Sequence, residues 1–265
     1  GGKGINVSTV LKNLGVDSVA LGFVAGFTGK AIEEGVAALG VKADFITVSD
    51  GVSRINVKLK AGEETEINGK GPNISDAELE ELYKKLDGLT DGDCLVLAGA
   101  IPPSLPSDVY EKIMARLAGK KVDIVVDATK DLLLNVLKYH PFLIKPNNFE
   151  LGEMFGVTLH SDEEIEEYAK RLQALGARNV AISMAGDGSM LITETGETYR
   201  MGVPKGKVVN SVGAGDSMVA GFIASYFAEH DYKKALKYGA ATGSATAFSE
   251  GLATKDQVEK LLGQF

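Results

Sequence analysis

The chain has 265 residues, of which 45% are hydrophobic and 24% are charged, and its net charge of −8 comes without a basic cluster. This composition is typical of a globular protein and argues against partners such as nucleic acids or anionic membrane surfaces. No apolar stretch approaches the roughly 20 residues of a membrane helix. The single cysteine, Cys94, lies in an apolar run, which indicates a core residue in a reducing compartment. We therefore expect a cytoplasmic protein.

Helices and strands alternate along most of the chain. A glycine turn at residues 1–4 precedes a predicted helix, a buried strand is predicted at 18–25, and a helix at 28–40. Further helices are predicted at 75–86, 107–118, 130–138, 147–155, 162–175, 214–228, 231–247 and 254–263. Further strands are predicted at 94–99, 122–128, 142–146, 179–184 and 189–194. This alternation indicates an α/β fold with a mainly parallel sheet covered by helices on both faces.

Residues 42–69 have a different pattern. Alternating runs at 45–49, 54–60 and 65–68 predict short, half-exposed antiparallel strands. We expect a small β excursion here, separate from an α/β core made of residues 1–41 and 70–265. The sequence begins at Gly1 inside a glycine-rich motif and without a methionine, so we also expect that the true N-terminus is missing.

The stretch NSVGAGDSMVAGF (210–222) predicts an anion site. Gly213, Ala214 and Gly215 precede an apolar helix, where free N–H groups and the positive end of the helix dipole meet. Asp216 follows directly. It is either a helix cap or a catalytic base beside a bound phosphate, and this stretch leaves both alternatives open.

Two further motifs open helices. GGKGIN (1–6) has Gly1, Gly2, Lys3 and Asn6 at a helix start, which suits close approach of a polyhydroxyl ligand. The alternative is an ordinary glycine turn with a surface lysine.

KPNNFEL (145–151) places Asn147 and Glu150 three residues apart, on one helix face. They form either a capping box or a site where Glu150 holds Mg²⁺ through water beside a nucleotide phosphate.

Other candidates have simple structural alternatives as well. SMAGDGS (183–189), with Ser183, Gly186 and Gly188, is a hairpin turn or a turn under a nucleotide. The basic residues of the excursion and of a later helix start are either solvated charges or phosphate ligands; they are Arg54, with Asn56 and Lys58 at alternate positions, and Lys130.

Some motifs are missing. GFTGKA does not match a Walker loop, and VGAGDSM does not match the dinucleotide fingerprint, which argues against an NAD-linked oxidoreductase. The three histidines are scattered, so neither a histidine metal site nor a catalytic triad is predicted. In an open α/β sheet, ligands bind beyond the carboxyl ends of the strands, where Gly99, Asp127, Lys145 and Ser183 follow their strands.

Taken together, GGKGINVS, KPNNFEL and NSVGAGDSMVAGF resemble, in order and spacing, the PfkB (ribokinase-like) sugar kinases. The resemblance covers the whole chain and implies a three-layer α/β/α ribokinase-like sandwich, with the 42–69 excursion as a β lid over the sugar site. It also implies ATP and Mg²⁺ as cofactors. An aspartate expected near the family's N-terminus, which contacts sugar hydroxyls, is not among these residues.

The resemblance implies a role for each matching residue. Asp216 is the catalytic base, kept ionised by the helix dipole, and the backbone of Gly213, Ala214 and Gly215 is the anion hole. Gly1, Gly2 and Asn6 match the family's sugar-binding signature. Lys3 in the same turn is a further substrate-binding candidate, and Arg54, Asn56, Lys58 and Lys130 remain the phosphate candidates that their own positions suggest. Asn147, Ser183, Gly186 and Gly188 bind the nucleotide, with Glu150 for Mg²⁺. Ala185 stands where the family's nucleotide strand has its first glycine.

The runs RINVKL and ETEINGKGP resemble family members that phosphorylate sugar phosphates. The expected reaction is ATP-dependent phosphorylation of fructose 1-phosphate at its 6-hydroxyl, with tagatose 6-phosphate or another phosphosugar as the alternative acceptor. A non-catalytic sugar-phosphate sensor is the alternative of another class, although a sensor needs no base at Asp216. Because one face of the lid is apolar, we expect a homodimer formed through the lid.

Overall fold

The computed structural model describes residues 2–61 and 63–265, and the side chains of residues 58, 60, 61, 63, 64 and 66 lie outside this description. Gly1 and the side chain of Lys58, both predicted to bind substrate, therefore lie outside the described residues. None of the helices in the described part of the chain combines the length and apolarity needed to cross a membrane.

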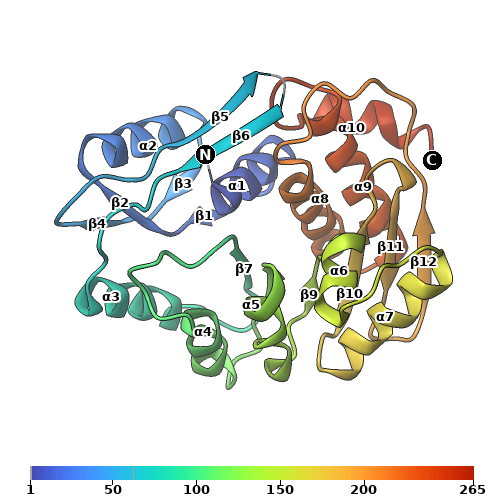
Figure 1. Cartoon of the computed structure of the whole chain (residues 1–265), viewed down its shortest axis with the longest axis horizontal. Helices are drawn as coiled ribbons and strands as arrows, with labels where there is room; N and C mark the ends of the chain where they lie inside the picture. The colour runs from blue at the N-terminus through green and yellow to red at the C-terminus, as the bar shows by residue number, and fades with distance from the viewer. Residues whose placement is uncertain (1, 62) are drawn as a thin grey trace.

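The central sheet has the strand order β12-β11-β10-β9-β8-β7 (Figure 1). The first four of these strands along the chain are parallel: β7 (Cys94–Ala98), β8 (Asp123–Asp127), β9 (Leu143–Ile144) and β10 (Asn179–Ser183). The last two, β11 (Ser189–Ile192) and β12 (Thr198–Met201), add an antiparallel edge. This confirms the predicted mainly parallel sheet, although the sequence did not predict β12.

Helices cover both faces of this sheet. One layer contains α1 (Lys3–Asn13), α8 (Ala214–Glu229), α9 (Tyr232–Ala247) and α10 (Lys255–Leu262). The other contains α3 (Asp76–Asp87), α4 (Val109–Leu117), α5 (Lys130–Leu134), α6 (Asn148–Phe155) and α7 (Asp162–Ala174). Each layer forms its own hydrophobic core with one face of the sheet. Adjacent residues of β8 point to opposite faces, so Val125 packs with the first layer and Val126 with the second. The predicted three-layer α/β/α sandwich is confirmed.

The excursion differs from its prediction in its pairing. β5 (Asn56–Ala61) and β6 (Glu63–Asn68) form the expected antiparallel hairpin. However, β4 (Ile46–Val48) pairs parallel with β2 (Phe23–Ala25), and β3 (Lys42–Ala43) pairs parallel with β1 (Val19–Ala20). The physical reason is α2 (Gly26–Ala38), which connects β2 to β4 as a crossover and so makes their pairing parallel.

The strand predicted at 18–25 was partly wrong. It is divided into β1 and β2, with Gly22 between them, and Val19 is 55% exposed and not buried. Strands β3 and β4 are therefore paired with β1 and β2. Within the excursion as the structure describes it, β5 and β6 form a separate antiparallel hairpin. The division into a core and a 42–69 lid stays a prediction.

Candidate active site

The first turn of α8 places Asp216 in the interior. Gly213 is the N-cap residue with φ 82°, a left-handed conformation that favours glycine, and the helix begins at Ala214 as predicted. Asp216 is 6% exposed, and its N-cap neighbour Gly213 has no side chain that could cap the helix. The carboxylate of Asp216 is turned toward α1, where it accepts a hydrogen bond from Asn6.

Helix α1 supplies the partners of Asp216. Gly2 is the N-cap residue of this helix, and Lys3 and Asn6 lie three residues apart on one face of it. Asn6 donates from Nδ2 to Asp216 Oδ2 at 2.8 Å, and Lys3 Nζ lies 3.9 Å from Asp216 Oδ1. The structure thus brings together the glycine-rich start of the chain and the motif around Asp216.

Two residues without a predicted role complete this cluster. Asp127 ends β8 and Lys145 follows β9, and both are buried, at 4% and 7% exposure. Asp127 Oδ2 lies 2.8 Å from Lys3 Nζ, and Asp127 Oδ1 lies 3.5 Å from Lys145 Nζ. Their position at strand ends was the sequence signal, but it did not say which of them would meet.

Burial and charge act against each other on the pKa values of this cluster. Burial raises the pKa of Asp216 above its usual range, although the hydrogen bond from Asn6 and the charge of Lys3 act in the opposite direction. The expectation that the helix dipole keeps Asp216 ionised stays a prediction, since burial shifts the pKa in the opposite direction. For Lys3, burial alone would lower the pKa, but Asp127 and Asp216 outweigh it and raise the pKa.

On the other side of the cluster, Asn147 and Glu150 form the capping box. Glu150 N–H donates to Asn147 Oδ1, and Asn147 N–H donates to Glu150 Oε2, both at 2.8 Å. Asn147 also forms a parallel bridge with Ser183 at the end of β10. The capping box, which was one of the two alternatives for this motif, is thus formed. It fixes the position of Glu150 and is compatible with a metal role.

The turn after Ser183 is a hairpin between β10 and β11, as its structural alternative predicted. Gly188 has φ 97°, and a side chain there would overlap the carbonyl oxygen of Met201. A Cβ on Gly186 would meet nothing within 4 Å, so the backbone is open there. Ala185 has φ 46°, an uncommon conformation for a residue with a side chain.

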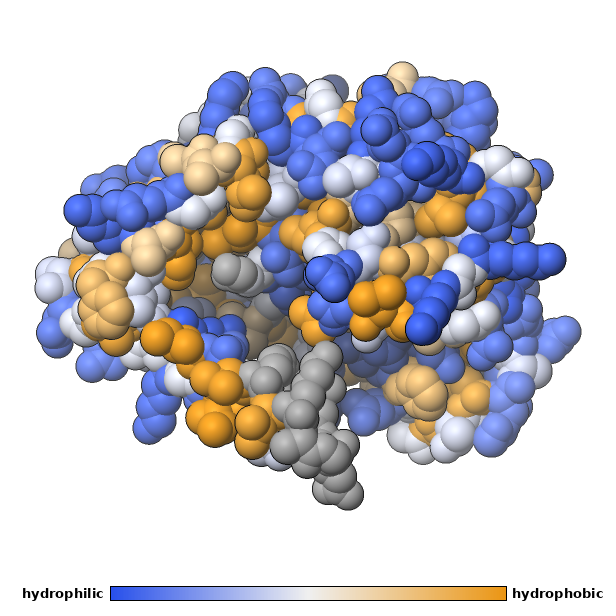
Figure 2. All heavy atoms as spheres, turned by 90° about the horizontal axis from the view of Figure 1, so that it is seen from above, coloured by the Kyte–Doolittle hydropathy of each residue, from blue (hydrophilic) through white to orange (hydrophobic). Residues whose placement is uncertain are grey.

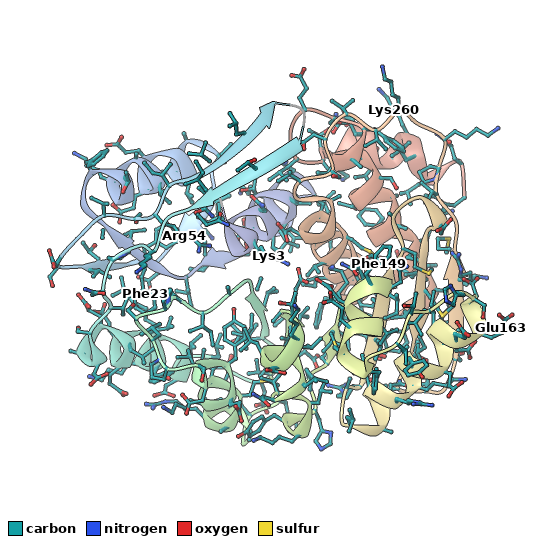
Figure 3. The ribbon with its side chains drawn as sticks, viewed as in Figure 1. Lys3, Phe23, Arg54, Phe149, Glu163 and Lys260 are labelled. Carbon is teal, nitrogen blue, oxygen red and sulfur yellow. The ribbon has the colours of Figure 1, made fainter. Side chains whose placement is uncertain are left out.

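The remaining predicted ligands lie apart from this cluster. Arg54 is exposed and precedes β5, so it is not within the strand predicted at 54–60. Asn56 begins β5 and pairs in register with Asn68. In Figure 3, Lys3 lies between Arg54 on one side and Phe149, at the start of α6, on the other.

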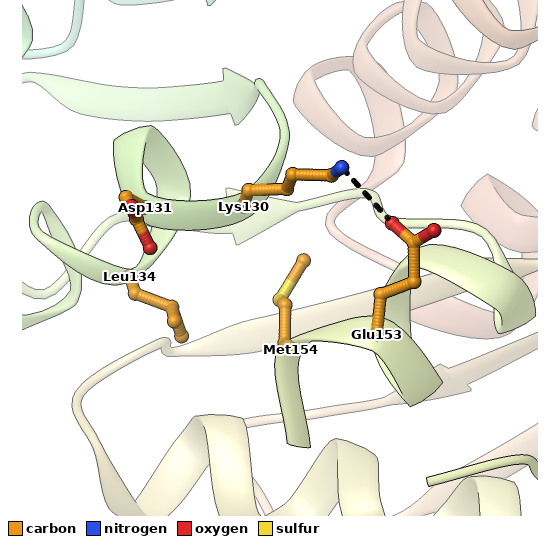
Figure 4. Close-up of a pocket in the computed structure, with 5 residues that line it drawn as sticks. All are labelled: Lys130, Asp131, Leu134, Glu153 and Met154. Atoms are coloured by element: carbon orange, nitrogen blue, oxygen red, sulfur yellow. Dashed lines mark ion pairs between the residues drawn. The ribbon is translucent and has the colours of Figure 1, made fainter. Parts of the chain in front are cut away.

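Lys130 lies on the α6 side and not beside Arg54. It begins α5 with φ 52°, and its Nζ lies 3.6 Å from Glu153 Oε2. Figure 4 shows both residues lining a cavity of about 370 Å³, together with Asp131, Leu134 and Met154. Lys130 is 70% exposed, so it is accessible to a ligand from that side.

The acidic residues fit a sparsely ligated Mg²⁺ ion. Across residues 2–61 and 63–265, no group of three or more His, Cys, Asp or Glu side chains could hold a metal by itself. Mg²⁺ in kinases typically uses one or two carboxylates, several waters and the substrate phosphates. Glu150, fixed by its capping box, provides an oxygen donor of this kind, whereas both oxygens of Asp127 already pair with lysine ammonium groups.

Comparison with known proteins agrees with this geometry. A 1-phosphofructokinase of Bacillus subtilis (strain 168) is 50% identical over 262 residues, which cover 99% of this chain and 86% of that protein. A D-tagatose-1-phosphate kinase of Bacillus licheniformis is 38% identical over 264 residues, covering 99% of this chain and 86% of that protein.

A solved structure and a family model cover the chain as well. The crystal structure of a proposed phosphofructokinase from Staphylococcus aureus matches 100% of this chain and 86% of that chain, with a TM-score of 0.91 and 45% identity. The model of the pfkB family carbohydrate kinases matches residues 1–259. This chain therefore belongs to the pfkB family of carbohydrate kinases, which are phosphotransferases with an alcohol acceptor.

Proposed function

We propose that this protein transfers the γ-phosphoryl group of ATP to the 6-hydroxyl of fructose 1-phosphate and so forms fructose 1,6-bisphosphate. The observation that carries the reaction type is Asp216, buried at the first turn of α8 and held by Asn6. The acceptor is supported by the name of the relative that is 50% identical over nearly the whole chain.

The chemistry assigns the proton and the phosphoryl group to separate parts of the site. The 6-hydroxyl oxygen attacks the γ-phosphorus, its proton passes to Asp216, and the bond to the bridging oxygen of ADP breaks. Asn6 fixes the carboxylate, and the raised pKa makes Asp216 a stronger base. The N–H groups of Gly213, Ala214 and Gly215 stabilise the charge on the transferring group.

The nucleotide is assigned to the α6 side of the site. Asn147, Ser183, Gly186 and Gly188 form this side, supported by the bridge between Asn147 and Ser183. Mg²⁺, when bound with ATP, neutralises charge on the phosphate oxygens, and Glu150 would hold it through water.

The sugar phosphate is assigned to the side formed by α1 and the lid, residues 42–69. Gly1, Gly2, Lys3 and Asn6 face the sugar in this proposal, and Arg54, Asn56 and Lys58 read its 1-phosphate. Arginine suits this role because its planar fork makes bidentate bonds to phosphate. Lys130 is a further phosphate ligand, and its place beside α6 favours the phosphates of the nucleotide.

The second candidate acceptor is D-tagatose 1-phosphate, in place of the 6-phosphate expected from the sequence. The relative named D-tagatose-1-phosphate kinase supports it. Tagatose and fructose differ in configuration at C4 alone, so the same 1-phosphate and 6-hydroxyl are available in both sugars. Discrimination would depend on hydrogen bonds to one hydroxyl.

We also propose a homodimer formed through the hairpin. Val57 and Ile67 are paired directly across the hairpin, so their side chains lie on the same face of it, and they are 46% and 60% exposed. Ile55 and Leu59 are similarly exposed. Figure 2 shows hydrophobic side chains gathered on this upper side of the molecule. An isolated hairpin is marginally stable in water, so a second copy would cover this face.

The test of the proposed function is a coupled assay of ADP release with a panel of acceptors. The panel contains fructose, fructose 1-phosphate, fructose 6-phosphate, tagatose 1-phosphate and tagatose 6-phosphate. The highest kcat/KM is expected for fructose 1-phosphate. Binding of a sugar phosphate without any turnover would instead indicate the non-catalytic sensor, and a preference for unphosphorylated fructose would overturn the phosphosugar assignment.

A further inference from the structure

Lys145 is a buried charge that the mechanism above does not use. Its side chain is 8% exposed, and its Nζ lies 3.5 Å from Asp127 Oδ1. Asp127 is already paired with Lys3 at 2.8 Å, so this one carboxylate is shared by two lysines. Burying an ammonium group is costly, and a carboxylate shared with Lys3, together with the nearby charge of Asp216, compensates it only in part. The position of Lys145 therefore calls for a further reason.

Gly215, in the first turn of α8, lies against the end of the Lys145 side chain and indicates that reason. A Cβ built on Gly215 would lie 3.2 Å from Lys145 Nζ and 3.7 Å from its Cε. Gly215 lies within α8, and in contrast to Gly213 it does not have a positive φ. Its backbone conformation therefore suits any residue, and the group that a side chain here would press on is the Lys145 ammonium group, which would have to move by a few tenths of an ångström.

We propose that Lys145 is an electrostatic positioning residue of the phosphoryl-transfer site, whose ammonium group adds positive charge to the first turn of α8, and that Gly215 lacks a side chain in order to admit it. This inference rests on the proposed function. A helix N-terminus carries roughly half a positive charge by itself. Lys145 adds a full charge beside the N–H groups that meet the transferring phosphoryl group.

The physical benefit of this arrangement is preorganisation. Charge grows on the phosphoryl oxygens in the transition state, and a fixed, buried positive charge stabilises it without reorganising water. Lys145 acts here through the turn of α8, and it also offsets the negative charges of Asp127 and Asp216. A purely structural partner of Asp127 would instead affect folding and leave the rate unchanged.

A double-mutant cycle on the full chain separates these two roles. Lys145→Met keeps the side chain as far as the position of Cε and removes the ammonium group. We expect it to lower kcat by about tenfold to a hundredfold, with the KM values for ATP and sugar phosphate within about threefold. Gly215→Ala should lower kcat and leave both KM values unchanged, because its Cβ shifts the ammonium group by a few tenths of an ångström.

The interaction between the two changes is the decisive result. In the Lys145→Met background, Gly215→Ala should change kcat less than twofold, because the remaining contact at 3.7 Å is an ordinary one. If the two changes multiply independently, a side chain at position 215 affects kcat by a route other than Lys145, and our inference is overturned. It is also overturned if Lys145→Met keeps more than a third of kcat.

Controls separate this result from misfolding and from a wrong acceptor. Each variant is tested for thermal unfolding and for binding of ATP, and Lys145→Gln replaces Lys145→Met if the latter does not fold. Lys30→Met, an exposed lysine on α2 at 77% exposure, should leave kcat unchanged. The cycle uses whichever sugar phosphate the panel selects, so a wrong acceptor overturns the proposed function and leaves this test intact.

Discussion

Asp216→Asn changes one charge in the proposed site and very little of its shape. The amide has the same size as the carboxylate, and its oxygen can still accept the 2.8 Å hydrogen bond from Asn6. The contact with Lys3 is long, at 3.9 Å, so its loss disturbs the packing little. What disappears is the group that accepts the proton of the sugar hydroxyl.

The expected loss follows from that single function. General-base catalysis contributes about 10²- to 10⁴-fold, which corresponds to about 2.7–5.5 kcal/mol of barrier. We expect kcat to fall by this factor in the coupled assay, with ATP binding unchanged by calorimetry. Asp76→Asn, at an exposed carboxylate in the first turn of α3, is the matched control and should keep full activity.

The same variant tests the direction of the pKa shift. Burial raises the pKa of Asp216 in the folded protein above its unfolded value of 3.8. The stability linked to its protonation is thus fully present below pH 3.8 and is lost as the pH rises through the folded-state pKa. At pH 8 the wild type contains a costly buried carboxylate, which Asp216→Asn removes.

Asp216→Asn should therefore have a Tm equal to or above that of the wild type at pH 8, and the difference should narrow as the pH falls. The acid limb of kcat/KM in the wild type should lie above pH 3.8 for the same reason. A loss of kcat smaller than tenfold would remove Asp216 from the role of base. A Tm at pH 8 well below that of the wild type would refute the argument from burial.

Three further changes test the acceptor side, the metal side and the hairpin. Arg54→Ala should raise the KM for fructose 1-phosphate by about tenfold to a hundredfold, because it removes a charge-assisted phosphate contact. The control Lys30→Ala should change no KM. If Arg54→Ala has the same KM for fructose 1-phosphate as the wild type, the phosphate role of Arg54 is contradicted. Glu150→Gln keeps the oxygen of the capping box but not its charge, so the Mg²⁺ concentration for half-maximal rate should rise about tenfold with little change in Tm. If Glu150→Gln lowers the Tm and leaves the Mg²⁺ dependence unchanged, Glu150 serves only to cap α6. Ile67→Asp should convert a dimer into a monomer in light scattering, and a fully active wild-type monomer at micromolar concentration would contradict the proposed interface.

The part of the site that could be predicted from sequence is the part encoded locally. A glycine turn before an apolar helical period predicted the start of α8 and the position of Asp216. Its hydrogen-bond partner Asn6 is 210 residues away, and no spacing rule connects the two. Only the resemblance to a family placed both in one site.

The pairing of Asp127 with Lys145 shows a second limit. The sequence placed both residues at carboxyl ends of strands, where ligands bind in α/β sheets. Whether they would meet depends on strand order, and β8 proved to lie next to β9. A pattern of apolar residues predicts a strand, but it contains no information about its neighbour.

The same limit explains the errors in the excursion. The run at 45–49 alternates as a half-exposed antiparallel strand would, yet β4 pairs parallel with β2. The partner is decided by the crossover through α2, which lies outside the run itself. Edge strand β12 was not predicted although its residues TYRM alternate between polar and apolar, because a run of four residues is at the lower limit at which alternation indicates a strand.

Ala185 is the position where this chain departs from the family's pattern, and the structure explains how the turn tolerates it. Its φ of 46° is the left-handed conformation that glycine adopts freely and that costs other residues about 1–2 kcal/mol. Hydrogen bonds from Asp187 N–H to Met184 O and from Gly188 N–H to Ala185 O hold the turn in this conformation. The hairpin between β10 and β11 thus imposes the backbone shape, and alanine changes the cost of the turn without changing its course. A nucleotide that contacts the backbone at this turn would therefore meet the same atoms that a glycine would present.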